Sequence, residues 1–294
     1  MKSGFVAIIG RPNAGKSTLL NAFTGEKIAV ISDKPQTTRN NILGIVNEKG
    51  AQVVFMDTPG IHRPKNKLGE FMVKEAENSV KGVDAIILVV SVDDNPSVND
   101  DIINNIKNTD VPVILVVNKT DSTEKEKILP LIADYSQKMS FDEIIPISAL
   151  KGDGVDIVYK EILNRLEEGP MYFPDDMVTD QPERQIVSEI VREKALWCLD
   201  KEVPHGIAVE ITEFKERNDS SVYVGVTINC EKKSHKGIII GKNGSMLKRI
   251  GQKARIDCEK FLGTKVYLEI WVKIKEDWRN SDFLIKNFGF DNKN

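Results

Sequence analysis

Hydrophobic residues in the first 169 positions form short, nearly unbroken runs that alternate with longer amphipathic stretches. The runs are rich in Val, Ile and Leu, as is typical of strands buried on both faces, and they occupy residues 5–9, 52–57, 85–90, 111–118 and 143–148. The stretches between them have apolar residues at helical spacing and predict helices over residues 16–24, 68–81, 98–107, 124–139 and 154–166. This alternation predicts an α/β domain with a mostly parallel sheet and helices on both faces. Residues 41–57 depart from it and predict an antiparallel hairpin at the sheet edge.

The pattern changes after residue 166. Residues 167–183 are rich in proline and acidic residues and have no period, so we place a linker at 170–182, between a first domain at 1–169 and a second at 183–294. The second domain shows a helical pattern, two alternating strands, a basic amphipathic helix, a further strand and a short final helix. If a short turn near Gly237 is counted as helical, the order is α-β-β-α-α-β, which predicts a smaller α+β domain.

Composition restricts where the protein works. The chain of 294 residues is 40% hydrophobic and 29% charged, as expected of a soluble two-domain protein, and its longest apolar runs are far too short to cross a bilayer. Its N-terminus predicts a first strand and not a secretory signal. Three widely spaced cysteines, Cys198, Cys230 and Cys258, are expected to be reduced thiols and not metal ligands. We therefore expect a cytoplasmic protein.

Charge is distributed unevenly between the two halves. Residues 1–182 contain 20 Lys and Arg against 27 Asp and Glu, a net charge of −7, whereas residues 183–294 contain 21 against 17, a net charge of +4. Most of the positive excess lies between Lys232 and Lys260, where nine basic residues accompany two acidic ones. On charge alone, a polyanion partner for the second domain and an ordinary solvated basic surface fit equally well.

A complete phosphate-binding motif follows the first predicted strand. Gly10–Ser17 reads GRPNAGKS, fits G-x-x-x-x-G-K-[ST], and opens a predicted helix. Glycines let backbone N–H groups converge on phosphate oxygens, and a helix N-terminus adds partial positive charge. Lys16 is expected to reach the β- and γ-phosphates, and the Ser17 hydroxyl is expected to ligate Mg²⁺. The expected phosphate-binding residues are Asn13, Ala14, Gly15, Lys16, Ser17 and Thr18.

Three further motifs follow at predicted strand ends. Asp57 ends one strand and Gly60 follows it, where a carboxylate can hold Mg²⁺ through water and a glycine N–H can sense a γ-phosphate. The stretch NKTD contains Asp121, whose carboxylate can accept two hydrogen bonds from guanine, a pair that adenine does not offer. In the stretch SAL, a backbone N–H can meet the guanine oxygen. The expected base-binding residues are Asn118, Lys119, Asp121, Ser148, Ala149 and Leu150.

A second glycine-rich stretch, His235–Gly251, does not repeat this chemistry. From Gly237 it is one residue too short between its glycines, and Asn243 replaces the Ser or Thr that binds Mg²⁺. The stretch GKNG instead fits GxxG, the loop with which KH domains clamp the backbone of about four nucleotides. The expected RNA-binding residues are Lys236, Gly237, Ile240, Gly241, Lys242, Asn243, Gly244, Lys248, Arg249 and Arg255.

The tryptophans and histidines predict no further site. Trp197 and Trp271 lie on apolar faces and are expected in the core, not on a base-stacking surface, while Trp278 is left unassigned. The histidines are scattered and predict no catalytic or metal cluster.

Residues 4–168 resemble the translation-factor class of P-loop GTPases through the motifs above. The resemblance implies that Lys34–Arg39 is the first switch loop and that Thr37 or Thr38 ligates Mg²⁺; of these we favour Thr38. It places Ser17 and Thr38 on Mg²⁺ directly and Asp57 through water. The catalytic set that it implies is Lys16, Thr38, Gly60 and Asn13.

Two positions bear on the rate of hydrolysis in such a protein. Ile61 stands where many signalling GTPases have a glutamine that positions water, so we expect slow unaided hydrolysis. In a subgroup of these GTPases, an asparagine at the position of Asn13 helps to bind K⁺ beside the β- and γ-phosphates, where a cation offsets developing charge. Asn13 has this role here or only shapes the loop; the sequence leaves both readings open.

The second domain resembles a type II KH domain, and the whole chain is similar to the bacterial Era family. That similarity adds the stretches TDQPER and REK, which belong to neither domain motif. It implies a GTP-dependent factor that binds the 3′ end of 16S rRNA and assists assembly of the small (30S) ribosomal subunit. It also implies a monomer with peripheral association at the inner face of the cell membrane. Two alternatives stay open: a GTPase acting on another RNA or at the membrane, and an RNA-binding protein with a non-hydrolysing G domain.

Overall fold

The computed structural model describes residues 1–34, 37–61, 64–217 and 220–290. The chain divides into two compact units, each described here by itself. The N-terminal unit comprises Met1–Ala29, Thr38–Arg63 and Met72–Asp180, and the C-terminal unit comprises Val30–Thr37, Pro64–Phe71 and Gln181–Asn294.

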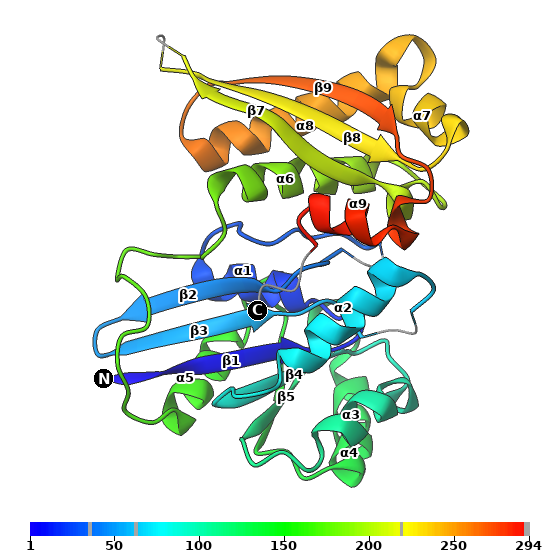
Figure 1. Ribbon diagram of the computed structural model, residues 1–294. Coiled ribbons are helices and arrows are strands. Elements are labelled where there is room, and N and C mark those ends of the chain that lie inside the picture. Colours follow the sequence, from blue (N-terminus) through cyan, green and yellow to red (C-terminus); the bar gives the residue numbers. More distant parts are fainter. Residues whose placement is uncertain (35–36, 62–63, 218–219, 291–294) are drawn as a thin grey trace. The chain divides into compact units, whose positions relative to one another are not determined.

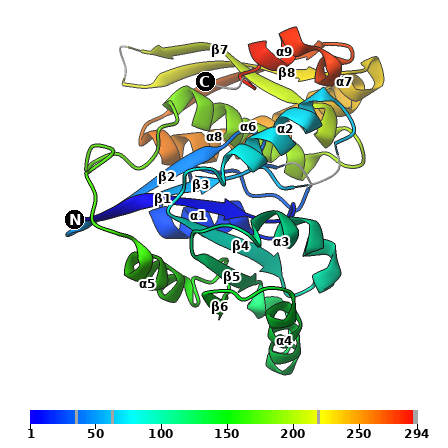
Figure 2. The same ribbon diagram turned by 60° about the horizontal axis from the view of Figure 1, so that its bottom comes forward.

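The N-terminal unit is built on a six-stranded sheet with the strand order β2-β3-β1-β4-β5-β6 (Figure 1 for β1 to β5, Figure 2 for β6). All neighbouring strands are parallel except β2 and β3, which form the predicted antiparallel hairpin at one edge. The strands are β1 (Lys2–Ile9), β2 (Ile42–Glu48), β3 (Ala51–Asp57), β4 (Ala85–Ser91), β5 (Val113–Asn118) and β6 (Glu143–Pro146). The helices are α1 (Lys16–Thr24), α2 (Lys67–Asn78), α3 (Asp100–Ile106), α4 (Ile128–Lys138) and α5 (Val155–Arg165).

Helices cover both faces of this sheet (Figure 2). Along β1, Val6 and Ile8 pack into a core with residues of α1 and α5, while Ala7 and Ile9 pack into a second core with residues of α3 and α4. Successive strand residues point to opposite faces, so a strand with both sets buried must be apolar throughout. The expectation drawn from the unbroken apolar runs is therefore confirmed for β1, β4 and β5, which are buried on both faces. It is wrong for β6 at the sheet edge, where Glu143 and Pro146 are exposed.

Residues 172–179, within the expected linker, lie along the hairpin edge and are called the strap. Gln52 on β3 accepts hydrogen bonds from the backbone N–H of Tyr172 (2.7 Å) and Phe173 (3.0 Å) and donates to the Phe173 carbonyl (2.8 Å). On β2, the Ile45 N–H donates to the Val178 carbonyl at 2.8 Å. The strap therefore belongs to the N-terminal unit as an ordered segment.

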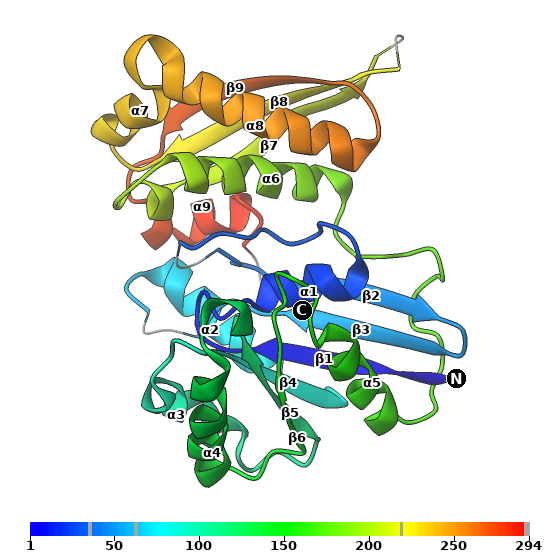
Figure 3. The ribbon, with the colours of Figure 1, turned by 180° about the vertical axis from the view of Figure 1, so that it is seen from behind.

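The C-terminal unit is built on a three-stranded sheet with the order β7-β8-β9. β8 pairs antiparallel with β7 and parallel with β9. Helices α6 and α8 pack on one face of the sheet, where Val187 and Ile190 of α6 meet Ile250 and Ala254 of α8 (Figure 3). The elements are α6 (Glu183–Cys198), β7 (Ala208–Glu216), β8 (Val222–Cys230), α7 (Lys233–Ile240), α8 (Ser245–Leu262), β9 (Val266–Ile274) and α9 (Asp282–Asn287).

This order confirms the predicted α-β-β-α-α-β arrangement and its short final helix. The turn expected near Gly237 is the two-turn helix α7. Two short segments from the first half of the chain also belong to this unit, and α2 begins in one of them. There Lys67 pairs with Asp282 of α9 at 2.5 Å, and the ring of Phe71 lies 6.4 Å from that of Phe290.

The expected burial of Trp197 and Trp271 is wrong. Trp197 is 49% exposed because its indole N–H donates to the Ile31 carbonyl at the unit's surface. Trp271 is 58% exposed because it points from β9 to the face of the sheet opposite α6 and α8, where Tyr267 is also exposed. Trp278, left unassigned, is fully buried and donates to the Gly206 carbonyl.

The three cysteines are buried and none is in a disulfide, in agreement with their expected reduced state. In the part of the chain that the structure describes, no helix combines the length and apolar character needed to span a bilayer.

Candidate functional site

The loop Gly10–Gly15 joins β1 to α1 and takes a conformation that its glycines permit. Gly10 and Gly15 have φ angles of 150° and 101°, and Asn13 at the exposed tip has φ 65°. A Cβ on Gly10 would lie 2.3 Å from the Val89 carbonyl oxygen, so a side chain is excluded there. Lys16 begins α1 directly after the loop. Backbone N–H groups at a helix start behind such a loop are suited to anions.

Lys16 is buried beneath this loop, with 5% of its surface exposed. Its Nζ donates to the carbonyls of Gly10 (3.2 Å) and Arg11 (3.0 Å) and so closes the loop from below. Burial lowers the pKa of Lys16, because the charged ammonium loses its water, and Asp57 partly opposes the change. A phosphate would supply the negative charge that this cation lacks.

Three oxygen ligands converge beside Lys16. The Ser17 Oγ lies 2.8 Å from Thr38 Oγ1 and donates to Asp57 Oδ2 at 2.6 Å, and Thr38 Oγ1 donates to the same carboxylate at 3.2 Å. Thr37, the other candidate, directs its hydroxyl to the Lys34 carbonyl at 2.6 Å instead. Within the described residues, the buried Asp57 Oδ1 has no hydrogen-bond partner. Hydroxyl and carboxylate oxygens are the ligands that Mg²⁺ prefers, so these residues fit that ion.

Asp57 is fully buried, and burial raises its pKa, although Lys16 and the hydrogen bonds from Ser17 and Thr38 oppose the shift. For both Lys16 and Asp57, the cost of desolvating the charged form therefore exceeds the electrostatic stabilisation that each receives from the other. A ligand that brings a divalent cation together with phosphates would compensate both.

Gly60 packs directly against the phosphate-binding loop. A Cβ there would lie 2.6 Å from the backbone nitrogen of Pro12. The next residue, Ile61, donates its N–H to the Gly10 carbonyl at 3.3 Å, and its side chain packs on the second core. The loop that starts at Asp57 is thus in contact with the phosphate-binding loop, as a γ-phosphate sensor must be.

The expected base-binding residues meet at the neighbouring strand ends. Asn118, buried at the end of β5, donates to the Ala14 carbonyl at 2.9 Å and accepts from the Ala149 N–H at 3.0 Å. It therefore ties the phosphate-binding loop to the loop after β6. The Ser148 hydroxyl donates to Asp121 Oδ1 at 2.6 Å and so orients that carboxylate. Lys119 has φ 67°, and Leu150 is 71% exposed at the rim.

The structure thus brings most of the expected nucleotide-binding residues to one edge of the sheet. Asn13 is exposed at the tip of the loop, and Thr18 follows Ser17 in the first turn of α1. In the first switch loop, Pro35 and Gln36 lie outside the described residues. The same holds for His62, one of the three histidines.

The second glycine loop lies between α7 and α8 and is open to solvent. Gly241 and Gly244 have φ angles of 72° and 75°, and Asn243 has φ 51°. A Cβ on Gly241 would lie 2.7 Å from that of Met246, so the loop requires glycine there. Lys242 and Asn243 are exposed at its tip. This geometry presents backbone and one cation to a ligand that runs along a surface.

The flanking helices extend this surface. Ile239 is in the core, Ile240 is half-buried and Ile238 is 49% exposed, so the isoleucine run is divided between core and surface. Lys236, half-buried, lies on α7, while the other expected basic residues are exposed on α8: Lys248, Arg249 and Arg255.

Gly237 has no structural requirement for glycine. It is exposed within α7, and a Cβ there would meet no protein atom within 4 Å. Glycine inside a helix is less stable than alanine. A bare helix surface at this point suits the close approach of a ligand backbone.

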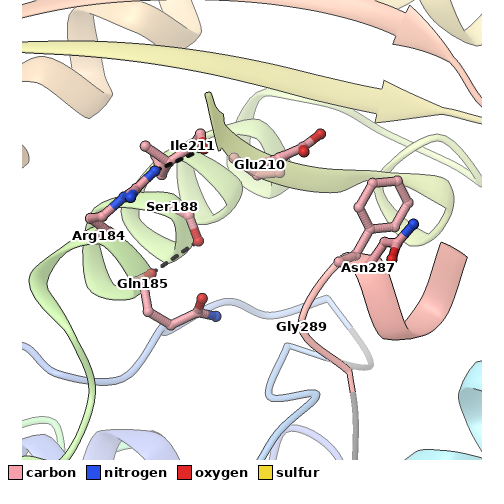
Figure 4. A pocket seen from close by; sticks show the side chains of 9 residues that line it. Arg184, Gln185, Ser188, Glu210, Ile211, Asn287 and Gly289 are labelled. Atoms are coloured by element: carbon pink, nitrogen blue, oxygen red, sulfur yellow. Dashed lines mark hydrogen bonds between the residues drawn. The ribbon is translucent and has the colours of Figure 1, made fainter. Parts of the chain in front are cut away.

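A pocket elsewhere in the C-terminal unit is not part of either site (Figure 4). It has a volume of about 200 Å³ and lies between the start of α6, β7 and the end of α9. Two of its polar side chains bond within the protein, since Arg184 donates to the Ile211 carbonyl (3.3 Å) and Ser188 to the Gln185 carbonyl (3.0 Å).

The sequence did not reveal which residues of α6 contact the chain at the first switch loop and just before it. Arg192, Glu193 and Trp197 on α6 bind the backbone of Ile31 and Thr37. Their only trace in the sequence is the REK stretch, which matches neither domain motif. No group of three or more His, Cys, Asp or Glu side chains able to hold a metal occurs within residues 1–34, 37–61, 64–217 and 220–290.

Comparison with known families matches each unit separately. Residues 5–119 match the family described as 50S ribosome-binding GTPase, and residues 202–279 match the KH domain family.

Full-length relatives match the whole chain. It is 55% identical over 295 aligned residues to GTPase Era of Ruminiclostridium cellulolyticum, with 100% of this chain and 99% of the relative covered. It is 54% identical to GTPase Era of Clostridioides difficile, with 99% of each covered.

Two solved structures match with 99% of each chain covered. A variant of Aquifex aeolicus Era bound to GDP and AlF4⁻ is 43% identical, with a TM-score of 0.94. Era in complex with MgGDPNP and nucleotides 1506–1542 of 16S ribosomal RNA is 44% identical, with a TM-score of 0.95.

Proposed function

Because this chain belongs to the Era family of GTPases, we propose that the residues around Lys16 and Asp57 bind and hydrolyse Mg²⁺-GTP and that the loop Gly241–Gly244 binds rRNA. The observation that supports the first part most directly is the convergence of Ser17, Thr38 and Asp57 beside the buried Lys16. In this proposal, Ser17 and Thr38 ligate Mg²⁺ and Asp57 binds it through water.

The protein's own groups position and stabilise the reacting phosphates. Lys16 and the N–H groups of the loop bind the β- and γ-phosphates, and the Gly60 N–H binds the γ-phosphate. Bound Mg²⁺ offsets the charge that develops during transfer. Asp121, oriented by Ser148, accepts two hydrogen bonds from guanine, while Asn118 keeps the two loops in register.

Hydrolysis by this site is expected to be slow. The side chain at Ile61 cannot hydrogen-bond water and packs into the core instead. A non-hydrolysing G domain is the alternative that Ile61 favours. The similar Aquifex protein binds GDP with AlF4⁻, a mimic of the transferring phosphoryl group, which supports hydrolysis.

For the C-terminal unit we propose single-stranded RNA at the 3′ end of 16S rRNA as the ligand, and assembly of the 30S subunit as the process served. Support comes from the open GxxG loop, the bare surface at Gly237 and the similar Era structure that contains nucleotides 1506–1542 of that RNA. We further propose a monomer with domains at 1–169 and 183–294, in the cytoplasm and peripherally at the inner face of the membrane.

Single-turnover assays test the nucleotide part. We expect Mg²⁺-dependent hydrolysis of GTP and none of ATP, because Asp121 cannot pair with adenine. Bound GTP that is never cleaved would favour the non-hydrolysing alternative. Sequencing RNA crosslinked to the protein in cells tests the RNA part, and enrichment of tRNA over the 16S 3′ end would contradict it.

Two hypotheses remain for Asn13 in the phosphate-binding loop: it helps to bind K⁺, or it only shapes the loop. We propose that it helps to bind K⁺, because it stands exposed at the loop tip with φ 65°, where its side chain can reach a cation beside the phosphates. Hydrolysis should then be faster in K⁺ than in Na⁺, and Asn13→Ala should abolish the difference. Equal rates in the two salts, with an unchanged rate for Asn13→Ala, would leave only a loop-shaping role.

A further inference from the structure

Helix α6 carries charged side chains that are almost completely buried. Arg192, Glu193 and Lys194 expose 1%, 0% and 4% of their surface. Charged residues are almost never buried without partners, because desolvation is costly. The hydrogen-bond and ion-pair partners of Arg192, Glu193 and Lys194 therefore identify the segments that this face of α6 binds.

One group of partners is the backbone of the switch segment, defined as Val30–Lys34 together with Thr37, which belongs to the same unit as α6. Glu193 Oε2 accepts from the Ile31 N–H at 3.3 Å, and the indole of Trp197 donates to the Ile31 carbonyl at 3.0 Å. Arg192 Nη2 donates to the Thr37 carbonyl. We call Arg192, Glu193 and Trp197 the α6 clamp.

The clamp is itself fixed by neighbouring groups. Arg192 Nε donates to both carboxylate oxygens of Glu189, at 2.9 and 3.1 Å. Glu193 pairs with Lys194 at 2.7 Å, and Lys194 also pairs with Asp257 on α8 at 2.6 Å. Glu189, Glu193 and Trp197 are spaced four residues apart and Arg192 lies three residues after Glu189, so each of them has a neighbour of this group on the same side of the helix. Buried or half-buried partners therefore preorganise the contacts that Arg192 and Glu193 make with the switch segment.

One of the residues that the clamp binds, Thr37, directly precedes Thr38, the proposed Mg²⁺ ligand. Thr38 follows Thr37, and the peptide group between them is planar, so a fixed Thr37 carbonyl restricts the Thr38 backbone. Thr38 is the residue whose hydroxyl lies 2.8 Å from Ser17 Oγ. Holding both ends of the switch segment, at Ile31 and Thr37, limits where that hydroxyl can be.

We propose that Arg192, Glu193 and Trp197 are positioning residues for GTP hydrolysis, which hold the switch segment so that Thr38 reaches Mg²⁺. This inference rests on the proposed GTPase function. It assigns to the REK stretch a role that neither domain motif explains.

The first experiment measures single-turnover GTP hydrolysis as a function of Mg²⁺ concentration. Arg192→Gln should raise the half-saturating Mg²⁺ concentration about tenfold, the loss expected for one charge-assisted hydrogen bond. The matched control is Arg184→Gln, the same substitution on the same helix, whose guanidinium donates to the Ile211 carbonyl of β7. Arg184→Gln should stay within about twofold of wild type.

The second experiment uses a smaller change in case Arg192→Gln fails to fold. Trp197→Phe removes the indole N–H but keeps an aromatic ring, and Trp271→Phe is the control on the exposed sheet face. Tryptophan emission should differ between the Mg²⁺-bound GTP-analogue state and the GDP state in wild type and Trp271→Phe. The difference should be lost in Trp197→Phe, because its indole reports on the switch segment.

The outcomes separate this inference from the proposed function. If wild type shows no Mg²⁺-dependent hydrolysis, the proposed function fails. If wild type hydrolyses GTP but Arg192→Gln and Trp197→Phe match their controls, the positioning role is wrong. A general structural role is shown instead if nucleotide-free RNA affinity falls by the same factor as hydrolysis. The inference requires that RNA affinity stay at the wild-type value.

Discussion

The two glycine-rich loops of this chain show how similar local sequences serve different ligands. Both place glycines in left-handed backbone before a helix and carry a lysine between or beside them. In the loop before α1 that lysine, Lys16, is buried and paired with backbone carbonyls, whereas Lys242 before α8 is exposed. The first loop is therefore built to surround a small ligand, whereas the second is suited to a ligand that runs along a surface.

The surroundings of each loop account for this difference. Side chains from two other strand ends reach the first loop and the start of α1: Asn118 donates to the Ala14 carbonyl, and Asp57 accepts from Ser17. The second loop lies at the end of a two-helix hairpin whose flanks are basic and solvent-exposed. Burial strengthens each electrostatic contact, so single changes in the first loop should have larger effects than single changes in the second.

The largest expected effect is that of Lys16→Ala. Removing the buried cation should lower single-turnover GTP hydrolysis by at least about 100-fold, as found when a preorganised donor to developing charge is removed. Lys242→Ala, the equivalent change in the second loop, should leave hydrolysis within about twofold, since an exposed charge contributes little at a distance. Comparable losses in the two variants would show that the loops are not functionally separate.

A smaller loss is expected for Gly60→Ala. Its Cβ would lie 2.6 Å from the Pro12 nitrogen, so the phosphate-binding loop or the Gly60 loop must shift. Overpacking of about 1–3 kcal/mol corresponds to a loss of roughly 5- to 150-fold in affinity for a GTP analogue. GDP affinity, measured in the same titration, should change much less because GDP has no γ-phosphate. An equal loss for both nucleotides would contradict the γ-phosphate role of Gly60.

For the second loop, Lys242→Ala should weaken RNA binding only a few-fold but change its salt dependence. Removing one phosphate contact to a single strand should reduce the slope of log K against log salt concentration by about 0.7. Fluorescence anisotropy at several salt concentrations measures this slope. The exposed Lys160 of α5, which pairs with Asp156, provides a control in which the slope should not change.

The smallest effects are expected for Gly237→Ala, which should make the protein more stable but weaken its RNA binding. The free energy of unfolding should rise by about 0.5–1 kcal/mol, because alanine is the better helix residue. RNA affinity should fall, because the added methyl group covers the bare surface of α7. Urea unfolding and RNA titration of the same preparation give both values, and a stabilised variant with wild-type affinity would remove Gly237 from the RNA surface.

Sequence patterns correctly predicted those helices and strands whose ends are set by neighbouring residues in the chain. Helix α1 was expected at residues 16–24 and spans Lys16–Thr24, because Gly15 and Gly25 bracket it. The α7 helix was underestimated, since glycine lowers local helix propensity while the burial of Ile239 stabilises the helix through tertiary packing.

The failures concern long-range partners. Alternation along β9 identified two faces but not which one the helices cover, so Trp271 was assigned to the core. Trp197 was assigned there too, because its partner, the Ile31 carbonyl, lies 166 positions away in the chain. The hydrogen bonds of Asn118 with Ala14 and Ala149 also join residues that lie far apart in the chain. Motif order suggested that these residues meet, but not which hydrogen bonds they form.

The strap along the sheet edge has a consequence for how the α6 clamp finds its target. Strap hydrogen bonds continue to Thr179, which donates to the Leu43 carbonyl at 2.6 Å, and α6 begins at Glu183. Four residue steps span at most about 14 Å. A tether this short keeps the effective concentration of α6 near the switch segment in roughly the millimolar range. Bonding between α6 and the switch segment is thus intramolecular, and dilution of the protein does not weaken it.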